Sequence, residues 1–323
     1  GGQGQYVNTL ERDRVRALQL FEQALPLADG ADSEQFYRDL ASLVQMNQGG
    51  GAWRLQVLTS TAGLPDFDNP QGVNRSDAAP VDADGKAIYY SAPESWAVAQ
   101  NDGERWRWAL AKAGSVSAAA AARSDLMFAQ WLQQQFGVQT MAWGPRVPFG
   151  QDGDEQEEEG KAGRFAVHTL DENETIARLA TGVQRFSLPD EFNFIKILRT
   201  VATNRADMNT AESAHDQLAS IFENRRQYDK AAAVLVNALE TFGDVAHRQQ
   251  RLKQITGNWG RFDNSELGAA GQPAKLGFIF RNGSKASFRA RSIDIESLVA
   301  DVKAYLKSNP GRLEWNRLQL DAI

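Results

Sequence analysis

The three histidines are the side chains of this sequence that titrate near neutral pH, and one of them lies close to carboxylates. His168, Asp171 and Glu174 follow one another at three-residue spacing, which on one face of a helix would suit a zinc ion. A helix from Asp171 to Thr181 explains the same residues, because Glu174 would complete a capping box with Asp171. The sequence favours the cap. A metal-dependent hydrolytic enzyme that uses His168 and nearby carboxylates is the alternative function.

Two further groups of carboxylates have partial features of a calcium site. Asp82 and Asp84 are followed by Gly85 as at the start of a calcium loop, but no acid stands at the closing position. A turn between Val81 and the apolar run that follows explains these residues and is favoured. The acidic segment 150–163 is expected to be a mobile surface loop, because its acids repel one another and their spacing is irregular. Whether either group binds calcium stays open.

The remaining composition narrows the possible chemistry. Cysteine is absent from the 323 residues, which excludes disulfides, thiolate metal sites and thiol nucleophiles. The net charge is -6 and the basic residues are dispersed among acids, so we expect no nucleic-acid partner. No apolar run reaches the length of a membrane span. We therefore assign no catalytic residue, no metal ligand and no cofactor, and the favoured interpretation is that the chain is not an enzyme.

The elements that must position any functional residue are mostly helices, and the clearest are expected between residues 213 and 243. Apolar and small residues recur there at the spacing of two packed antiparallel helices. The positions concerned are His215, Leu218, Ala219, Phe222, Tyr228, Ala231, Leu235 and Ala238. This pattern resembles a tetratricopeptide repeat, in which small residues lie where two helices cross closely and neighbouring repeats stack into a solenoid. Ala17, Phe21 and Ala24 repeat part of the same spacing.

The sequence thus predicts a mainly α fold, a tetratricopeptide-like α-solenoid followed by a small unit with a β-hairpin and a helix. We expect an N-terminal helical repeat region over 1–63 and a helical region with long inserted loops over 64–187. The tetratricopeptide-like region spans 188–262, and the C-terminal unit spans 263–323. Four polar residues alternate with the packing positions of the first repeat helix and are the candidate partner-binding residues. They are Asp216, Ser220, Glu223 and Asn224.

In the C-terminal unit, apolar and polar residues alternate from Lys275 to Arg291, as in a β-hairpin. A three-residue loop through 281–283, with Gly283 in the left-handed conformation, would place the apolar side chains on one face. A helix capped by Asp294 follows, and its apolar stripe is expected to cover that face.

Several short strings of the chain carry a second resemblance. They lie at 52–56, 79–86, 136–141, 168–170, 175–182, 188–193, 223–228, 257–260 and 280–283. With these strings the chain is similar to the N-terminal region of very large planctomycete alpha-macroglobulin-like proteins. The resemblance implies an exported, extracytoplasmic protein in which a helical front section precedes β-sandwich domains. It implies protease inhibition only for a whole parent protein, and without cysteine this segment has no thioester.

The function that the sequence favours is that of a non-catalytic scaffold or protein–protein interaction region. Its partner would be another protein or a neighbouring domain of the same polypeptide. The polar residues of the first repeat helix would bind that partner.

Overall fold

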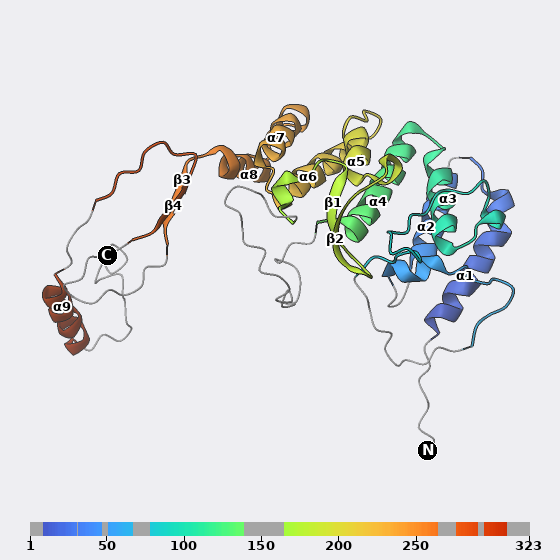
Figure 1. The fold of residues 1–323 in the computed structure, drawn as a ribbon, viewed down its shortest axis with the longest axis horizontal. Coiled ribbons are helices and arrows are strands. Elements are labelled where there is room, and N and C mark those ends of the chain that lie inside the picture. The colour runs from blue at the N-terminus through green and yellow to red at the C-terminus, as the bar shows by residue number, and fades with distance from the viewer. Residues whose placement is uncertain are drawn as a thin grey trace, which may run out of the picture. The chain divides into compact units, whose positions relative to one another are not determined.

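The structure is a computed structural model that describes residues 9–30, 32–46, 51–66, 78–138, 165–263, 276–289 and 294–308. It divides into two compact units, residues 1–256 and residues 257–323, which are considered separately. The described residues are mainly helical and include two small antiparallel hairpins (Figure 1). The acidic segment 150–163 lies outside the described residues, so the predictions made for it are not addressed.

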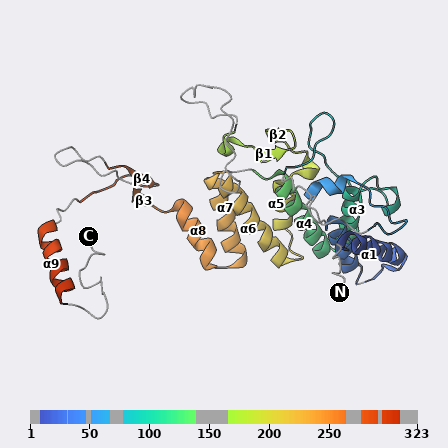
Figure 2. The same cartoon turned by 90° about the horizontal axis from the view of Figure 1, so that it is seen from below.

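The first unit consists of helices that follow one another closely in space. They are α1 (Leu10–Ala24), α2 (Ser33–Gln45), α3 (Asp102–Gly114), α4 (Ala118–Phe136), α5 (Phe194–Ala202), α6 (Met208–Asn224), α7 (Tyr228–Phe242) and α8 (Ala246–Thr256). Short 3-10 helices lie at Leu25–Leu27, Gly51–Gln56, Trp96–Val98, Val167–Thr169 and Asp190–Phe192. Each α-helix packs against the next one along the chain, and Figure 2 shows α4 to α8 side by side in that order. None of the helices in the described ranges is long and apolar enough to span a membrane.

Side-chain caps fix where several of these helices begin. Asn101, Ser117, Asn193 and Asp207 each accept a hydrogen bond from a backbone N–H in the first turn of α3, α4, α5 and α6. Ser33 and Gly137 are of residue types that often cap helices, but neither is a cap of the usual kind here. Ser33 is the first residue of α2 and donates its hydroxyl to the Gly30 carbonyl. Gly137 follows α4 with an ordinary φ of -63°, not in the left-handed conformation.

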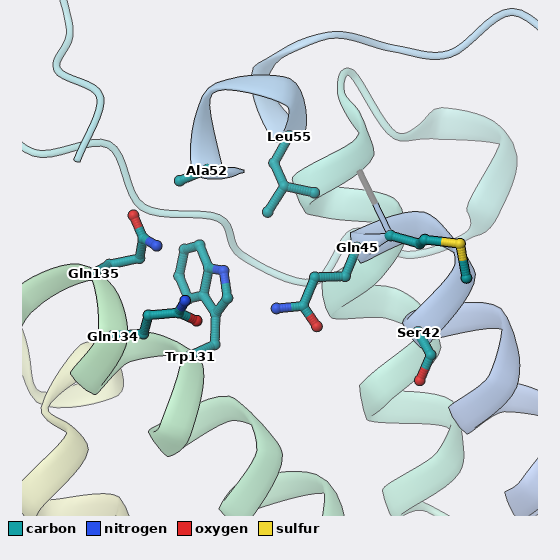
Figure 3. Close-up of a pocket in the computed structure, with 8 residues that line it drawn as sticks. Ser42, Gln45, Ala52, Leu55, Trp131, Gln134 and Gln135 are labelled. Atoms are coloured by element: carbon teal, nitrogen blue, oxygen red, sulfur yellow. The ribbon is translucent and has the colours of Figure 1, made fainter. Parts of the chain in front are cut away.

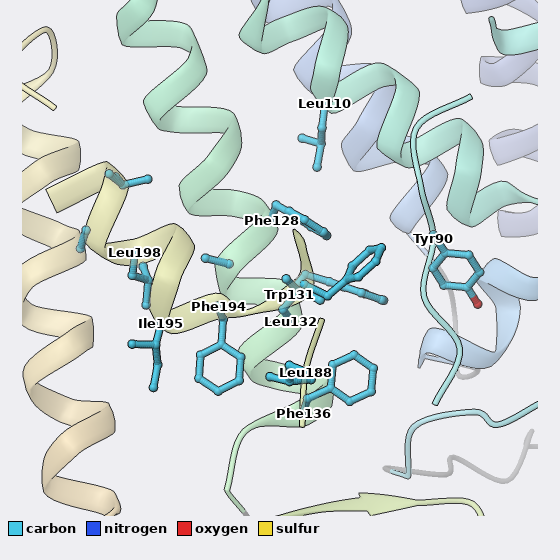
Figure 4. Close-up of a cluster of buried hydrophobic side chains, with 14 of the residues drawn as sticks. Tyr90, Leu110, Phe128, Trp131, Leu132, Phe136, Leu188, Phe194, Ile195 and Leu198 are labelled. Carbon is cyan, nitrogen blue, oxygen red and sulfur yellow. The ribbon is translucent and has the colours of Figure 1, made fainter. Parts of the chain in front are cut away.

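The core of the first unit is rich in aromatic side chains from α3 and α4 (Figure 4). The ring centroids of Trp106 and Trp131 lie 4.8 Å apart, and Phe128 and Phe136 contact the same pair. These tilted and edge-to-face contacts are the arrangements that aromatic rings favour. Trp106 is fully buried in this core.

A salt-bridged arginine connects three of the helices. Arg123 on α4 binds both carboxylate oxygens of Glu34 on α2 at 2.7 Å. Its third nitrogen, Nη1, binds Asp207, the cap of α6, at 2.5 Å. Bidentate guanidinium–carboxylate pairs are strong and directional, so this contact sets the positions of α2 and α6 relative to α4.

The predicted helix from Asp171 to Thr181 was wrong, because these residues enter a β-hairpin. Strand β1 (Glu174–Leu179) pairs antiparallel with β2 (Gly182–Ser187). Gly182 permits the turn with a φ of +117°, a conformation that side chains disfavour. Ala79 from the predicted inserted loop pairs with the end of β1: it donates its N–H to the Arg178 carbonyl and accepts a hydrogen bond from the Ala180 N–H, both at 2.9 Å. Part of the insertion is therefore packed against the hairpin.

In the second unit the predicted hairpin partner was wrong. Strand β4 (Phe278–Arg281) pairs with β3 (Trp259–Phe262) and not with the residues after it, and 284–289 form no strand. Gly260 allows this pairing, since a Cβ there would lie 2.4 Å from the Phe278 ring. The turn residue with positive φ is Asn282, at +57°, and not Gly283.

Helix α9 (Ile295–Lys307) begins as predicted, with Asp294 accepting a hydrogen bond from the Ser297 N–H at 3.1 Å. Its apolar stripe was predicted to cover the apolar face of the hairpin, and this was wrong. No residue of α9 is buried, and the aromatic side chains of β3 and β4 are also largely exposed. The helix therefore does not cover the apolar face of the hairpin.

Candidate interaction surface on helix α6

Helix α6, which carries the candidate partner-binding residues, is held by close contact with α7. The methyl groups of Ala219, Ala231 and Ala238 are at most 1% exposed, because the two helices pack tightly at these positions. The turn between the helices is short, and Arg226 adopts a φ of +55° while Gln227 donates its N–H to the Phe222 carbonyl at 2.9 Å. The prediction of two helices that contact each other, with these small residues buried, is confirmed.

The polar face of α6 is occupied in part by the next helix but one, α8. Arg248 of α8 is 1% exposed and binds Asp216 in a bidentate pair, with Nε–Oδ1 at 2.8 Å and Nη2–Oδ2 at 2.7 Å. Its Nη1 atom lies 2.7 Å from Glu212 Oε1. One turn further along α8, Arg251 donates to Glu223 at 3.0 Å and to the Ser220 hydroxyl at 3.1 Å. Three of the four candidate residues thus contact this chain's own helix.

The charges on this face stabilise one another. Burial alone would raise the pKa of Asp216, but the hydrogen bonds and the positive charge of Arg248 outweigh burial and lower that pKa. His247 and Arg251 act in the same direction through their charges. The pKa of Arg248 is raised in turn, chiefly by its hydrogen bond with Asp216. Both pKa shifts favour the charged form, so Asp216 and Arg248 are both ionised at neutral pH.

Asn224 is separated from the other three residues and is exposed at the end of α6. It borders a pocket of about 130 Å³ together with Gln133 and Phe194. The buried guanidinium of Arg225 is on the same border and donates through Nη1 to the Asp171 carbonyl at 3.0 Å. Burial lowers the pKa of Arg225 to about 10, although the charges of Glu172 and Glu174 oppose the shift. The structure therefore places three candidate residues under α8 and one at a pocket, and their binding of a partner stays a prediction.

Sequence reasoning missed the two cations of α8 that contact this surface. Arg248 and Arg251 lie three residues apart in α8, which places both on one helical face. That spacing was the available signal, but it does not say which acids the two cations would meet.

His215 is a packing residue of α6. Its Nδ1 atom lies 2.9 Å from the Ala211 carbonyl, which accepts a hydrogen bond from it, and Nε2 lies 2.8 Å from the side-chain oxygen of Asn237. The ring also packs edge-on against Phe242. The interpretation of His215 as a core or groove residue is confirmed by its burial.

The three residues of the hypothetical zinc site lie in β1 and in the segment that leads into it. His168 is exposed in the 3-10 helix Val167–Thr169. The Asp171 N–H donates to Glu174 at 3.0 Å, as a capping box requires, but the element that follows is β1. A hydrogen bond of 2.6 Å from Arg185 occupies Glu174 and lowers its pKa. In the ranges that the structure describes, no group of three or more His, Asp or Glu side chains is placed to hold a metal ion.

Asp82 forms the predicted turn. Its Oδ1 atom accepts hydrogen bonds from the N–H groups of Asp84 at 2.9 Å and Lys86 at 2.8 Å, and Gly85 has a φ of +77°. Val81 and Ala87 pair across the turn. One carboxylate oxygen of Asp82 is therefore used to hold the backbone of the turn.

Comparisons with known proteins add no relative: no protein-family model matches the chain, and no similar protein is found among curated proteins or solved structures. The resemblances to tetratricopeptide repeats and to macroglobulin-like proteins therefore rest on the sequence patterns alone.

Proposed function

We propose that this chain is a non-catalytic scaffold whose polar surface on α6 binds protein segments, either neighbouring domains of its own polypeptide or a separate protein. One observation carries the proposal: the surface already binds a helix. The buried Arg248 of α8 meets two carboxylates of α6, at 2.7–2.8 Å. Charge-assisted bidentate contacts of this kind give a surface both affinity and orientation.

The arrangement of the helices supports a tetratricopeptide-like α-solenoid as part of the proposal. Polar contacts join alternate helices, since Gln217 of α6 binds Gln133 of α4 and Asp216 of α6 binds Arg248 of α8. Helices α5 and α7 lie between these in the chain, and each of them packs against α6. Alternate helices would then form two layers, as they do in solenoids of helix pairs.

The partner-binding residues in this proposal are Asp216, Ser220, Glu223 and Asn224. The first three bind α8 and so join the scaffold to the residues that follow it, whereas Asn224 is free to meet a separate segment. An extracytoplasmic location, and a parent protein of the macroglobulin-like kind, belong to the proposal through the sequence resemblance only.

The proposal is tested by placing a photo-crosslinking amino acid at Asn224 in the protein as its source organism produces it. A matched control carries the same amino acid at Val236, which is exposed on α7. We expect a discrete crosslinked product from position 224, within the polypeptide or to one protein, and none of that size from position 236. Identical products from both positions, or no product from 224, would contradict the assignment of this surface.

A further inference from the structure

A pocket of about 400 Å³ lies in the first unit, apart from the surface on α6. Figure 3 shows it between the end of α2, the 3-10 helix Gly51–Gln56 and the end of α4. Its volume falls within the range of about 300–1,000 Å³ that is usual for small-molecule sites. We call it the Trp131 pocket, after the aromatic side chain on its wall.

The lining of the Trp131 pocket is polar but carries no charge. Three side-chain amides line it, those of Gln45, Gln134 and Gln135, together with the apolar Leu55. These amides form no hydrogen bond within the described parts of the chain. The two other pockets described for this unit differ, because Arg199 and Lys230 line one and Arg225 lines the other. A charged ligand would find no counter-ion in the Trp131 pocket, and leaving water without one is costly.

The aromatic wall of the pocket is rigid. Trp131 is 5% exposed, and its ring packs against Trp106 at 4.8 Å and against Tyr90 at 6.0 Å. The indole nitrogen lies on the side of the ring that faces Gln45 (Figure 3), and it has no acceptor among the described residues. A ligand would therefore meet a fixed apolar edge and one fixed N–H donor.

Taken together, these features match one chemical class. Each amide offers both donors and an acceptor, which suits neighbouring hydroxyl groups that also donate and accept. The indole edge suits the apolar C–H groups of the same ligand. We propose that the Trp131 pocket binds a sugar unit of a neutral carbohydrate. This site lies on different helices from the proposed protein-binding surface and does not depend on it.

The test follows the indole N–H signal of Trp131 by nitrogen-15 NMR of the whole chain. The sequence has 8 tryptophans, so the Trp131 signal is assigned as the one that a Trp131→Phe variant lacks. Glucose, galactose and N-acetylglucosamine are titrated separately, with glucuronate as the charged comparison. We expect a saturable shift of the Trp131 signal with at least one neutral sugar and a much weaker effect of glucuronate.

The matched variants separate the pocket from general effects. The double variant Gln45→Ala/Gln134→Ala loses two of the amides and should weaken binding about tenfold, which corresponds to about 1.4 kcal/mol of binding free energy. Gln249→Ala, on the exposed face of α8, should leave binding unchanged. The proposal is overturned if no neutral sugar shifts the Trp131 signal, if the double variant binds as tightly as the unchanged chain, or if glucuronate binds equally well.

Discussion

At the scale of single residues, Arg248 makes the main contact between α8 and the surface on α6. A residue that is 1% exposed and carries a guanidinium needs partners for its charge and its donors: Asp216 accepts two hydrogen bonds from it, and Glu212 forms an ion pair with it. Asp216 and Glu212 keep about a third of their side-chain surface in contact with solvent, at 34% and 35%. The two acids therefore remain stabilised in part by water, whereas the guanidinium depends on its contacts with them.

The lowered pKa of Asp216 predicts how stability depends on pH. Since its pKa is lower in the folded than in the unfolded chain, the unfolded chain binds more protons between the two values, and stability rises with pH there. The contribution is complete above the ordinary aspartate pKa of about 3.9 and is lost as the pH falls through the folded value. The free energies of unfolding of the unchanged chain and of Asp216→Asn should therefore differ by a constant amount from pH 6 to about pH 4, and should converge as the pH falls below about 4. A difference that stays constant below that pH as well would show that the carboxylate charge contributes nothing.

At the scale of elements, small side chains set the contact between α6 and α7. Replacing Ala231 by Leu inserts a larger side chain where the present methyl group is fully buried. Overpacking of this kind costs about 1–3 kcal/mol, so the free energy of unfolding in a denaturant titration should fall by that amount. The matched change Ala233→Leu lies in the same helix at an exposed position and should cost little. Equal losses in both variants would mean that helix propensity or solubility is responsible, and not packing.

The helices were predictable from the sequence, but the strands were less so. Helical spacing of apolar residues places α6 and α7 near their observed bounds, because the pattern is long and local. The segment entering β1 was misinterpreted since the contact between Asp171 and Glu174 is the same in a helix cap and in this turn. What decides the strand is distant: Thr175 is fully buried and donates its hydroxyl to the Phe136 carbonyl of α4.

The pairing of β4 depends on a similar non-local choice. The alternation after Lys275 indicates a strand with an apolar face, but it does not select the partner strand. Gly260 makes β3 suitable, because the Phe278 ring fills the space beside it. Only part of the candidate surface was predictable in the same way. The polar residues of α6 follow from local spacing, but their contacts with α8 depend on residues further along the chain.

At the scale of the whole molecule, the two compact units differ in how much they bury. The first contains an aromatic core, whereas no described residue from 257 onward is buried. Backbone amides exchange faster where few buried contacts protect their hydrogen bonds. Hydrogen exchange followed by mass spectrometry should therefore show earlier deuterium uptake in β3, β4 and α9 than in α3 to α7. Equal protection of both units would indicate that the second unit is packed more tightly than described.

The central claim is that α6 binds other segments through specific charged contacts, and that α8 is the first of them. A double-mutant cycle with Asp216→Asn, Arg248→Met and both changes together measures this contact directly in the free energy of unfolding. Arg248→Met alone should cost about 1.5–3 kcal/mol, the range for hydrogen bonds to charged groups. The account predicts that the double variant loses clearly less than the sum of the two single losses, by about 1 kcal/mol or more. Losses that simply add would contradict it, because Asp216 and Arg248 would then stabilise the protein independently.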